Sequence, residues 1–282
     1  SPIKKFIGQV LAAFLIIYYG RIQIRSMHGF FGIHELPEMF SLLISYFSVI
    51  VIINSFNLID GVDGLAGTLG LMSSALFGIY FLSKGMAPYY TLAFSLCGSL
   101  LAFLIFNFQP AKIFMGDTGS LLIGVINAIL ALKFIDPGNG PEFSKPMEAS
   151  PAIGFTILMI PLLDTLRVFA IRIFKRRSPF SPDRNHIHHL LLDRGFSHRT
   201  ITLLLVAVNV RMVVFVNLAR SLGTTILILS VIALFFTFIA IAYYSRPHDS
   251  LDWAAGLEDK KEKVKESKVV TFVRDSMLDQ EH

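Results

Sequence analysis

Three short clusters of polar residues carry nearly all the side chains in this sequence that could do chemistry. The first spans positions 54–65 and reads Asn-Ser-Phe-Asn-Leu-Ile-Asp-Gly-Val-Asp-Gly-Leu. Asn54 and Asn57 are three residues apart, a spacing that places both on one face of a helix. Asp60 and Asp63 share that spacing, but the glycines that follow them favour a tight turn that a ligand could approach closely. Carboxylates near a membrane edge are costly unless a cation, a hydrogen-bond donor or water lies beside them. The alternative to a functional site is an acidic loop without function.

The second cluster spans positions 107–120 and reads Asn-Phe-Gln-Pro-Ala-Lys-Ile-Phe-Met-Gly-Asp-Thr-Gly-Ser. It contains Asn107, Lys112 and Asp117, and Thr118 or Ser120 could cap the helix that follows. Asp117 is then a carboxylate beside a helix N-terminus. Such an end suits an anion, and a divalent metal on Asp117 would draw phosphate to the same place. The alternative is that Asp117 is simply a capping residue.

The third cluster is a basic, proline-containing loop at positions 175–189 that ends in three histidines within four residues. Its candidates are Arg184, His186, His188 and His189. A zinc site would need further ligands, and neither a cysteine nor a glutamate lies near the three histidines in the sequence. Arginine and histidine together favour a clamp for phosphate. Metal binding and a purely structural role remain the alternatives.

The composition indicates a membrane protein. The chain has 282 residues, of which 54% are apolar and 16% charged, with a mean hydropathy of +0.62. A soluble domain is roughly 45–50% apolar and about 25% charged. The apolar surface of this chain is therefore more than one globular core can bury. The formal net charge of +5 could suggest nucleic acid, but the basic residues lie between apolar blocks, which fits a membrane protein better. The single cysteine, Cys97, excludes an internal disulfide framework.

Eight apolar blocks are long enough, with flanking residues or tilt, to be membrane-spanning helices. They are continuously apolar rather than alternating, which favours helices over a β-barrel. The predicted fold is therefore an all-α polytopic membrane protein. The blocks are Phe6–Tyr19, Met39–Ile53, Leu65–Leu82, Tyr90–Phe106, Leu121–Ile135, Ile153–Phe174, Ile201–Leu218 and Thr225–Tyr244.

Lysine and arginine are concentrated in the loops that carry the three clusters, which predicts that these loops and both termini are cytoplasmic. Residues 1–245 are predicted to form one membrane domain, and residues 246–282 a charged cytoplasmic tail without chemistry of its own. Asp164 and Arg167 are three residues apart and are expected to pair. Arg211 falls within an apolar block, so it must face the bundle, snorkel, or mark a wrong boundary.

Carboxylates that suit a metal, beside basic residues that suit phosphate, are the equipment of phosphoryl transfer. At a membrane surface, this combination suggests a soluble phosphorylated donor and a lipid acceptor. The residues alone do not name that donor.

At these clusters the sequence resembles the polyprenyl-phosphate N-acetylhexosamine-1-phosphate transferases, which begin O-antigen (lipopolysaccharide), enterobacterial common antigen and teichoic-acid linkage synthesis. The resemblance rests on Asn-x-x-Asn-x-x-Asp-Gly-x-Asp-Gly-Leu ending at Leu65, Phe-Met-Gly-Asp-Thr-Gly-Ser ending at Ser120, and His-x-His-His ending at His189. It implies an enzyme of the bacterial inner membrane. Undecaprenyl phosphate would attack the β-phosphorus of a UDP-N-acetylhexosamine, with UDP-GlcNAc as the default, and UMP would leave.

The resemblance also implies roles for individual residues. Asp117, with Asp63, would bind Mg²⁺, or Mn²⁺ in its place, and Asp60 would help organise the metal and the donor. The remaining candidates would bind substrate or donate hydrogen bonds to it: Asn54, Asn57, Asn107, Lys112, Arg184, His186, His188 and His189. The implied partners are the two substrates and the lipid bilayer, without nucleic acid, and a homodimer is one option for the assembly.

Family members have about eleven spans and an Asp-Asp pair upstream of a segment like the one at Ser1-Pro2-Ile3-Lys4-Lys5. We therefore expect the 282-residue chain to lack about three spans and to be inactive alone. Two other functions compete. A CDP-dependent phospholipid synthase would need Asp-Gly-x-x-Ala-Arg, which the first cluster lacks. A cation transporter would usually place its carboxylates near the bilayer midplane rather than at one edge.

Overall fold

The structure is a computed structural model that describes residues 2–136, 147, 149–176 and 185–244. By its internal contacts the chain divides into two units, residues 1–239 and residues 240–282. The elements are α1 Pro2–Phe14, η1 Leu15–Tyr19, β1 Ser26–Phe30, β2 Ile33–Glu35, α2 Glu38–Ile59, α3 Leu65–Ser83, α4 Ala87–Asn107, α5 Gly116–Ile135, α6 Ser150–Ile157, α7 Met159–Phe174, α8 Ile187–Leu192, α9 His198–Leu218, η3 Arg220–Leu222 and α10 Thr224–Tyr244.

Among the described residues, six helices are long and apolar enough to cross a membrane, namely α2, α3, α4, α5, α9 and α10. This confirms the prediction of a helical, multi-pass membrane protein. The count of eight spans is not confirmed, because two of the predicted blocks contain shorter helices. One consists of α1 and the π-helical turn η1, and the other is divided into α6 and α7.

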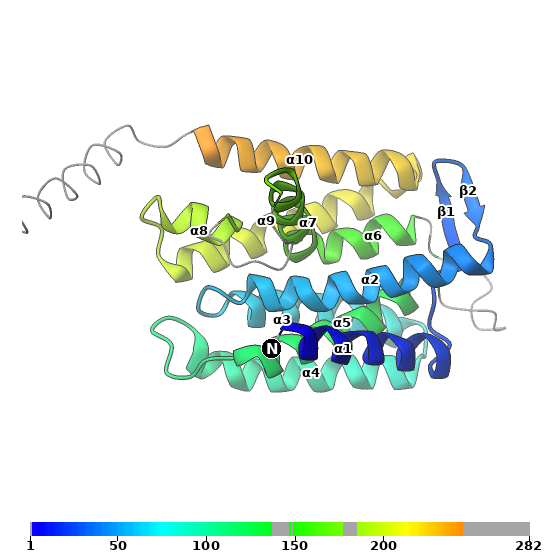
Figure 1. Cartoon of the computed structure of the whole chain (residues 1–282), viewed down its shortest axis with the longest axis horizontal. Coiled ribbons are helices and arrows are strands. Elements are labelled where there is room, and N and C mark those ends of the chain that lie inside the picture. Colours follow the sequence, from blue (N-terminus) through cyan, green and yellow to red (C-terminus); the bar gives the residue numbers. More distant parts are fainter. Residues whose placement is uncertain (1, 137–146, 148, 177–184, 245–282) are drawn as a thin grey trace, which may run out of the picture. The chain divides into compact units, whose positions relative to one another are not determined.

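The division between α6 and α7 has a local cause in Pro161, which lies in the first turn of α7. Proline has no N–H, and its ring clashes with the carbonyl four residues earlier, here that of Ile157, the last residue of α6. Figure 1 shows α6 running along the bundle and α7 almost end-on, so the chain changes direction sharply between them.

Asn209 of α9 satisfies the backbone at this break. Its side-chain oxygen accepts the N–H of Ile160 at 3.2 Å, and its amide nitrogen donates to the carbonyls of Thr156 at 3.0 Å and Ile157 at 3.2 Å. Asn209 is fully buried. A broken helix in an apolar bundle needs such a partner because no water is present to replace the lost helical bonds.

The core lies between α2, α3 and α5, where small and polar residues let the helices pack closely. A Cβ atom on Gly124 of α5 would lie 2.7 Å from the Cα of Ile53 in α2, so only glycine fits there. Asn127 of α5 accepts the hydroxyl of Ser73 in α3 at 2.6 Å and donates to Ser74 at 3.4 Å. These contacts hold the helices that begin or end at the predicted clusters.

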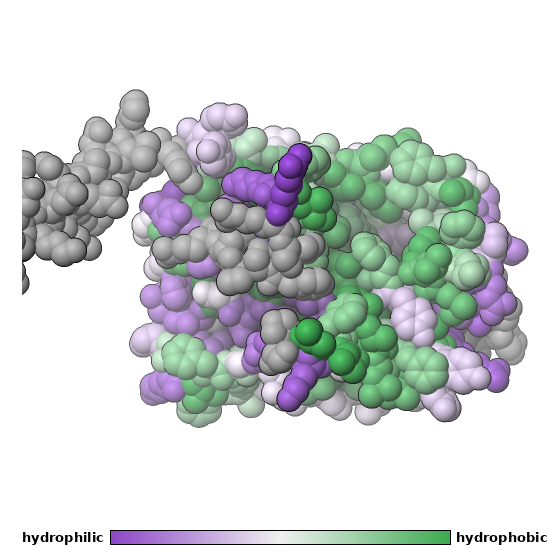
Figure 2. Space-filling view, in the orientation of Figure 1, coloured by the Kyte–Doolittle hydropathy of each residue, from purple (hydrophilic) through white to green (hydrophobic). Residues whose placement is uncertain are grey.

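The α2–α3 turn, the α4–α5 loop and α8 lie at one end of the bundle, and the β1–β2 hairpin lies at the other (Figure 1). The hairpin was not predicted. In Figure 2, hydrophobic residues cover much of the middle of this face, and hydrophilic residues gather toward its two ends. Arg211 lies within α9 and its side chain is exposed, so it does not face the bundle interior and the span boundary was not misplaced.

We predict that Asn209→Leu lowers the free energy of unfolding by about 1–3 kcal/mol, because it leaves the Ile160 N–H and two carbonyls buried without partners. Thermal unfolding of the purified protein in detergent measures the change. Val210→Leu, at an exposed neighbouring position of the same helix, is the control. Equal unfolding midpoints for the two variants would contradict the role of Asn209.

Candidate functional site

Asp117 lies in the first turn of α5, where three helices meet. Its carboxylate contacts the Nζ of Lys5 in α1 at 2.5 Å and accepts the side-chain amide of Asn57 in α2 at 3.0 Å. The same amide group reaches the hydroxyl of Ser120 at 2.9 Å. The Asp117 side chain is still 56% exposed, so a ligand can approach it.

The predicted cap of α5 by Thr118 or Ser120 is wrong. The helix begins at Gly116, its N-cap is Met115, and that residue makes no side-chain capping bond. Ser120 instead donates to carbonyls within the first turn. Asp117 is not a simple capping residue either, because its side chain bonds to residues of α1 and α2.

The first cluster is helical in its first half and forms a turn in its second half. Asn54 and Asn57 lie on α2, which ends at Ile59, and the two aspartates lie in the turn before α3. Gly64 has a φ of +77°, which explains the glycine at the N-cap of α3. Burial, and then the negative charge of Asp117, raises the pKa of Asp60 to about 7, so the two carboxylates are close enough to repel each other.

Asn54 supports the site without reaching its centre. Its side-chain amide exchanges two hydrogen bonds with that of Gln9 in α1, at 3.1 and 2.9 Å. Gln9 is buried. This amide pair fixes α1 against α2 and thereby places Lys5, one helical turn earlier on α1, beside Asp117.

Asp63 is held by the start of α9. Its carboxylate lies 3.2 Å from the Nδ1 of His198, and its carbonyl accepts the hydroxyl of Thr202 at 3.2 Å. The α4–α5 loop is tied to the same helix, because Gln109 accepts the N–H of Arg199 at 3.0 Å. Two of the three predicted clusters therefore rest on the first turns of α9.

Asn107 and Lys112 differ in their surroundings. Asn107 is buried, accepts the N–H of Gly64 at 2.9 Å and donates to the carbonyl of Ile113 at 2.8 Å. In this structure it joins the α4–α5 loop to the α2–α3 turn rather than facing a ligand. Lys112 is exposed.

Two of the three histidines of the third cluster are buried. His186 and His188 are buried, at 4% and 1% exposure, and His189 is half-buried. Burial is the main reason that the pKa of His188 falls to about 3, so its ring is neutral at pH 7 and carries no positive charge for phosphate. Arg184 lies outside the described residues.

The third cluster meets the first at Gly61. A Cβ atom there would lie 2.4 Å from the Nε2 of His188, so the ring packs directly against the turn that carries Asp60 and Asp63. Within the described part of the chain, the structure thus joins all three clusters through contacts. Sequence reasoning missed Lys5, which was read only as a topology signal, and His198, which stands alone in the sequence.

The residues fit a divalent metal bound with its substrate rather than one held in a protein cage. Among the described residues there is no group of three His, Cys, Asp or Glu side chains placed to hold an ion. Mg²⁺ is usually bound by one or two carboxylates together with water and substrate phosphates. The exposed carboxylate of Asp117, with the charge of Asp60 close by, is such a donor set.

Comparison with known proteins identifies the class. Residues 1–135 match glycosyl transferase family 4, and the chain belongs to that family.

Among its relatives is the undecaprenyl-phosphate alpha-N-acetylglucosaminyl 1-phosphate transferase of Escherichia coli K12, 32% identical over 196 residues that cover 68% of this chain and 52% of the relative. A decaprenyl-phosphate N-acetylglucosaminephosphotransferase of Mycobacterium leprae is 33% identical over 222 residues, which cover 73% of this chain and 55% of the relative. A probable undecaprenyl-phosphate N-acetylglucosaminyl 1-phosphate transferase of Bacillus subtilis is 34% identical over 206 residues, which cover 71% of this chain and 54% of the relative. The chain spans about half the length of the curated relatives it matches.

We predict that Gly61→Ala displaces His188 and lowers the thermal unfolding midpoint, because the added methyl group would overlap the buried ring. Gly98→Ala is the matched control, since a Cβ atom at this position in α4 meets nothing within 4 Å. Alanine also has the higher helix propensity, so the control should be neutral or slightly stabilising. Equal midpoints for the two variants would show that the turn and the histidine loop are not in firm contact.

Proposed function

We propose that the protein containing this chain transfers N-acetylglucosamine 1-phosphate from a UDP-sugar to a polyprenyl phosphate in the bacterial inner membrane. The observation that carries the proposal is the half-exposed Asp117, which contacts a lysine at the end of an apolar bundle where all three clusters meet. A phosphate oxygen of the lipid would attack the β-phosphorus of the donor. The bond from that phosphorus to the bridging oxygen breaks, and UMP leaves.

The residues of the chain divide the work by their chemistry. Asp117, with Asp60 and Asp63, would hold Mg²⁺, or Mn²⁺ in its place, which when bound neutralises charge on the diphosphate. Lys5 is the cation placed to meet the phosphates, because it already touches the carboxylate that would hold the metal. Asn57 fixes the orientation of Asp117 through its amide. The acceptor phosphate is an anion at neutral pH, so alignment rather than a protein nucleophile is required.

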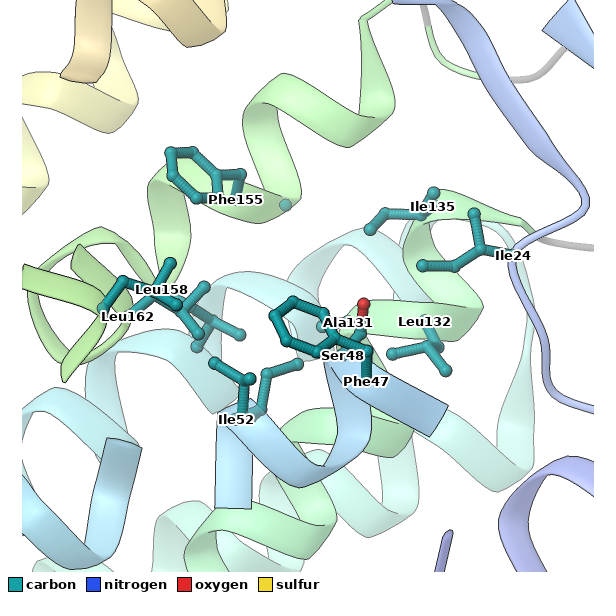
Figure 3. A pocket seen from close by; sticks show the side chains of 13 residues that line it. Ile24, Phe47, Ser48, Ile52, Ala131, Leu132, Ile135, Phe155, Leu158 and Leu162 are labelled. Atoms are coloured by element: carbon teal, nitrogen blue, oxygen red, sulfur yellow. The ribbon is translucent and has the colours of Figure 1, made fainter. Parts of the chain in front are cut away.

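An apolar cavity of about 150 Å³ supports a lipid acceptor. It opens between α2, α5, α6 and α7 and is lined by side chains that include Phe47, Ile52, Leu132, Phe155, Leu158 and Leu162 (Figure 3). Leu162 and Leu166 lie on α7, the helix whose Asp164 contacts the histidine loop. We propose that the cavity holds a segment of the prenyl chain and that α7 links it to the phosphate site.

The orientation follows from where the substrates come from. A UDP-sugar is made in the cytoplasm, so we propose that the end carrying the three clusters faces the cytoplasm, as the lysine and arginine distribution predicts. The test expresses the whole gene and measures UMP release from membranes across a panel of UDP-sugars, with and without Mg²⁺. Absence of UMP release with every UDP-sugar from folded protein would overturn the proposed function.

We predict that Asp117→Asn reduces UMP release by about a hundredfold or more, because the amide keeps the shape but loses the charge needed by a cation. Thermal unfolding checks that the variant is folded. Asp193→Asn, which alters an exposed carboxylate after α8, should retain wild-type turnover. Near-normal turnover of the Asp117 variant would remove this residue from the metal role.

Lys5→Met is expected to lower turnover by about ten- to a hundredfold, because a hydrogen bond to a charged group contributes roughly 1.5–3 kcal/mol. Methionine preserves the length and loses the charge. Lys4→Met is the matched control, since it changes the neighbouring exposed lysine of the same helix. Steady-state UMP release at varied UDP-sugar measures both variants, and equal losses in the two would contradict a specific role for Lys5.

A further inference from the structure

Asp164 of α7 is a fully buried carboxylate with three donors around it. One oxygen accepts Arg167 at 2.8 Å and the N–H of Ile187 at 2.9 Å, and the other oxygen lies 2.8 Å from the Nδ1 of His186. Arg167 also donates to the carbonyl of Asn185. The pairing predicted for Asp164 and Arg167 is therefore present, and the pair holds residues 185–187 against α7.

This arrangement assigns the proton on the His186 ring. Three donors and the arginine charge favour the ionised form of Asp164, and an ionised carboxylate can only accept. The proton between the two side chains therefore sits on Nδ1 of His186. The other ring nitrogen, Nε2, is buried and has no hydrogen-bond partner among the residues that the structure describes.

A structural histidine normally has both nitrogens satisfied, because an unpaired buried polar atom costs about 1–3 kcal/mol. The bonds of Asp164 to the Ile187 N–H and to Arg167 would be enough to hold residues 185–187 against α7. That role does not need the His186 ring, which has one unpaired nitrogen. The His186 ring stacks on that of His188 with centroids 5.6 Å apart and an interplanar angle of 4°. His188 in turn packs against Gly61 beside Asp60 and Asp63, so the His186 ring is one ring away from the turn that carries these carboxylates.

We propose that Asp164 is a positioning residue that fixes the proton on Nδ1 of His186 and thereby offers Nε2 to the polar part of the donor substrate. The use of Nε2 in catalysis rests on the proposed function, whereas the position of the proton does not. Asp164 lies outside the three clusters, and its contact with His186 joins residues 22 positions apart.

The proton can be located without any activity measurement. In the full chain labelled with ¹⁵N-histidine and held in lipid nanodiscs, ring ¹H–¹⁵N spectra distinguish Nδ1–H from Nε2–H. The resonance of His186, among eight histidines, is the one that His186→Gln removes. We expect it to show a protonated Nδ1, and a resonance with a bare Nδ1 in the unsubstituted chain would overturn the proposal.

Asp164→Asn then tests the cause. Its single oxygen is needed by Arg167 and Ile187, so its amide group must face His186 and donate to Nδ1. We expect the proton to move to Nε2, with the resonance of the distant His34 unchanged and with Asp193→Asn behaving as wild type. An unchanged His186 resonance in folded Asp164→Asn would overturn the proposal, and if this variant does not fold, the spectrum of the unsubstituted chain decides.

Turnover completes the experiment. In membranes that contain the whole protein, Asp164→Asn should lower UMP release by about ten- to a hundredfold, as expected for loss of an orienting partner. A shifted proton with full turnover would overturn the catalytic use of Nε2. A protonated Nδ1 in a protein that releases no UMP from any UDP-sugar supports the positioning of His186 and overturns the proposed function instead.

Discussion

Polar groups inside an apolar helical bundle must satisfy one another, and the structure depends on this constraint. Water cannot compensate a broken helix or a buried charge there, so each such group needs a protein partner. Asn209 is the partner of the backbone groups at the α6–α7 break. Arg167 and the backbone of α8 are the partners of the buried carboxylate of Asp164. Apart from the pair of Asp164 and Arg167 within α7, these contacts connect different elements, and they therefore also determine where the functional side chains lie.

The candidate site lies at the end of the bundle, where polar groups have protein partners on one side and are exposed on the other. Asp117 is bonded to Lys5 and Asn57 on its protein side and is still half-exposed on the other. Asp60 is buried enough for its pKa to be raised to about 7, with the Asp117 charge contributing. Two nearby carboxylates with one contacting lysine form a site that gains from a further cation, which is the electrostatic basis for proposing Mg²⁺.

Much of the architecture could be predicted from the sequence, because apolar blocks of about 20 residues have few alternatives in a membrane. The break in the block from Ile153 to Phe174 was missed because the residues remain apolar across it, although Pro161 was a visible signal. The contact of Asp164 with Arg167 was predictable from helical spacing. Its contact with His186 was not, because no local pattern encodes which loop returns to a buried carboxylate.

The same limit applies to the candidate site. Asn57 and Asp117 were identified from residue type and glycine context, but Lys5 and His198 reach the site only through tertiary packing. Asn107 has the residue type of a ligand contact, yet both ends of its amide bond to the backbone. Residue type indicates what a side chain can do, whereas the packing of distant segments decides whether it faces a ligand.

The burial of the histidines bears on the phosphate recognition that we propose for this site. A ring with a pKa of about 3 is neutral at physiological pH, so His188 contributes shape rather than positive charge. In the function we propose, attraction of a diphosphate would then come from the cation and from exposed basic side chains such as Lys5 and Lys112. The histidines supply fixed geometry, because Asp164 and Gly61 leave their rings little freedom. In the function we propose, charge and orientation would thus be provided by different residues, and a lipid phosphate would be aligned mainly by the fixed rings.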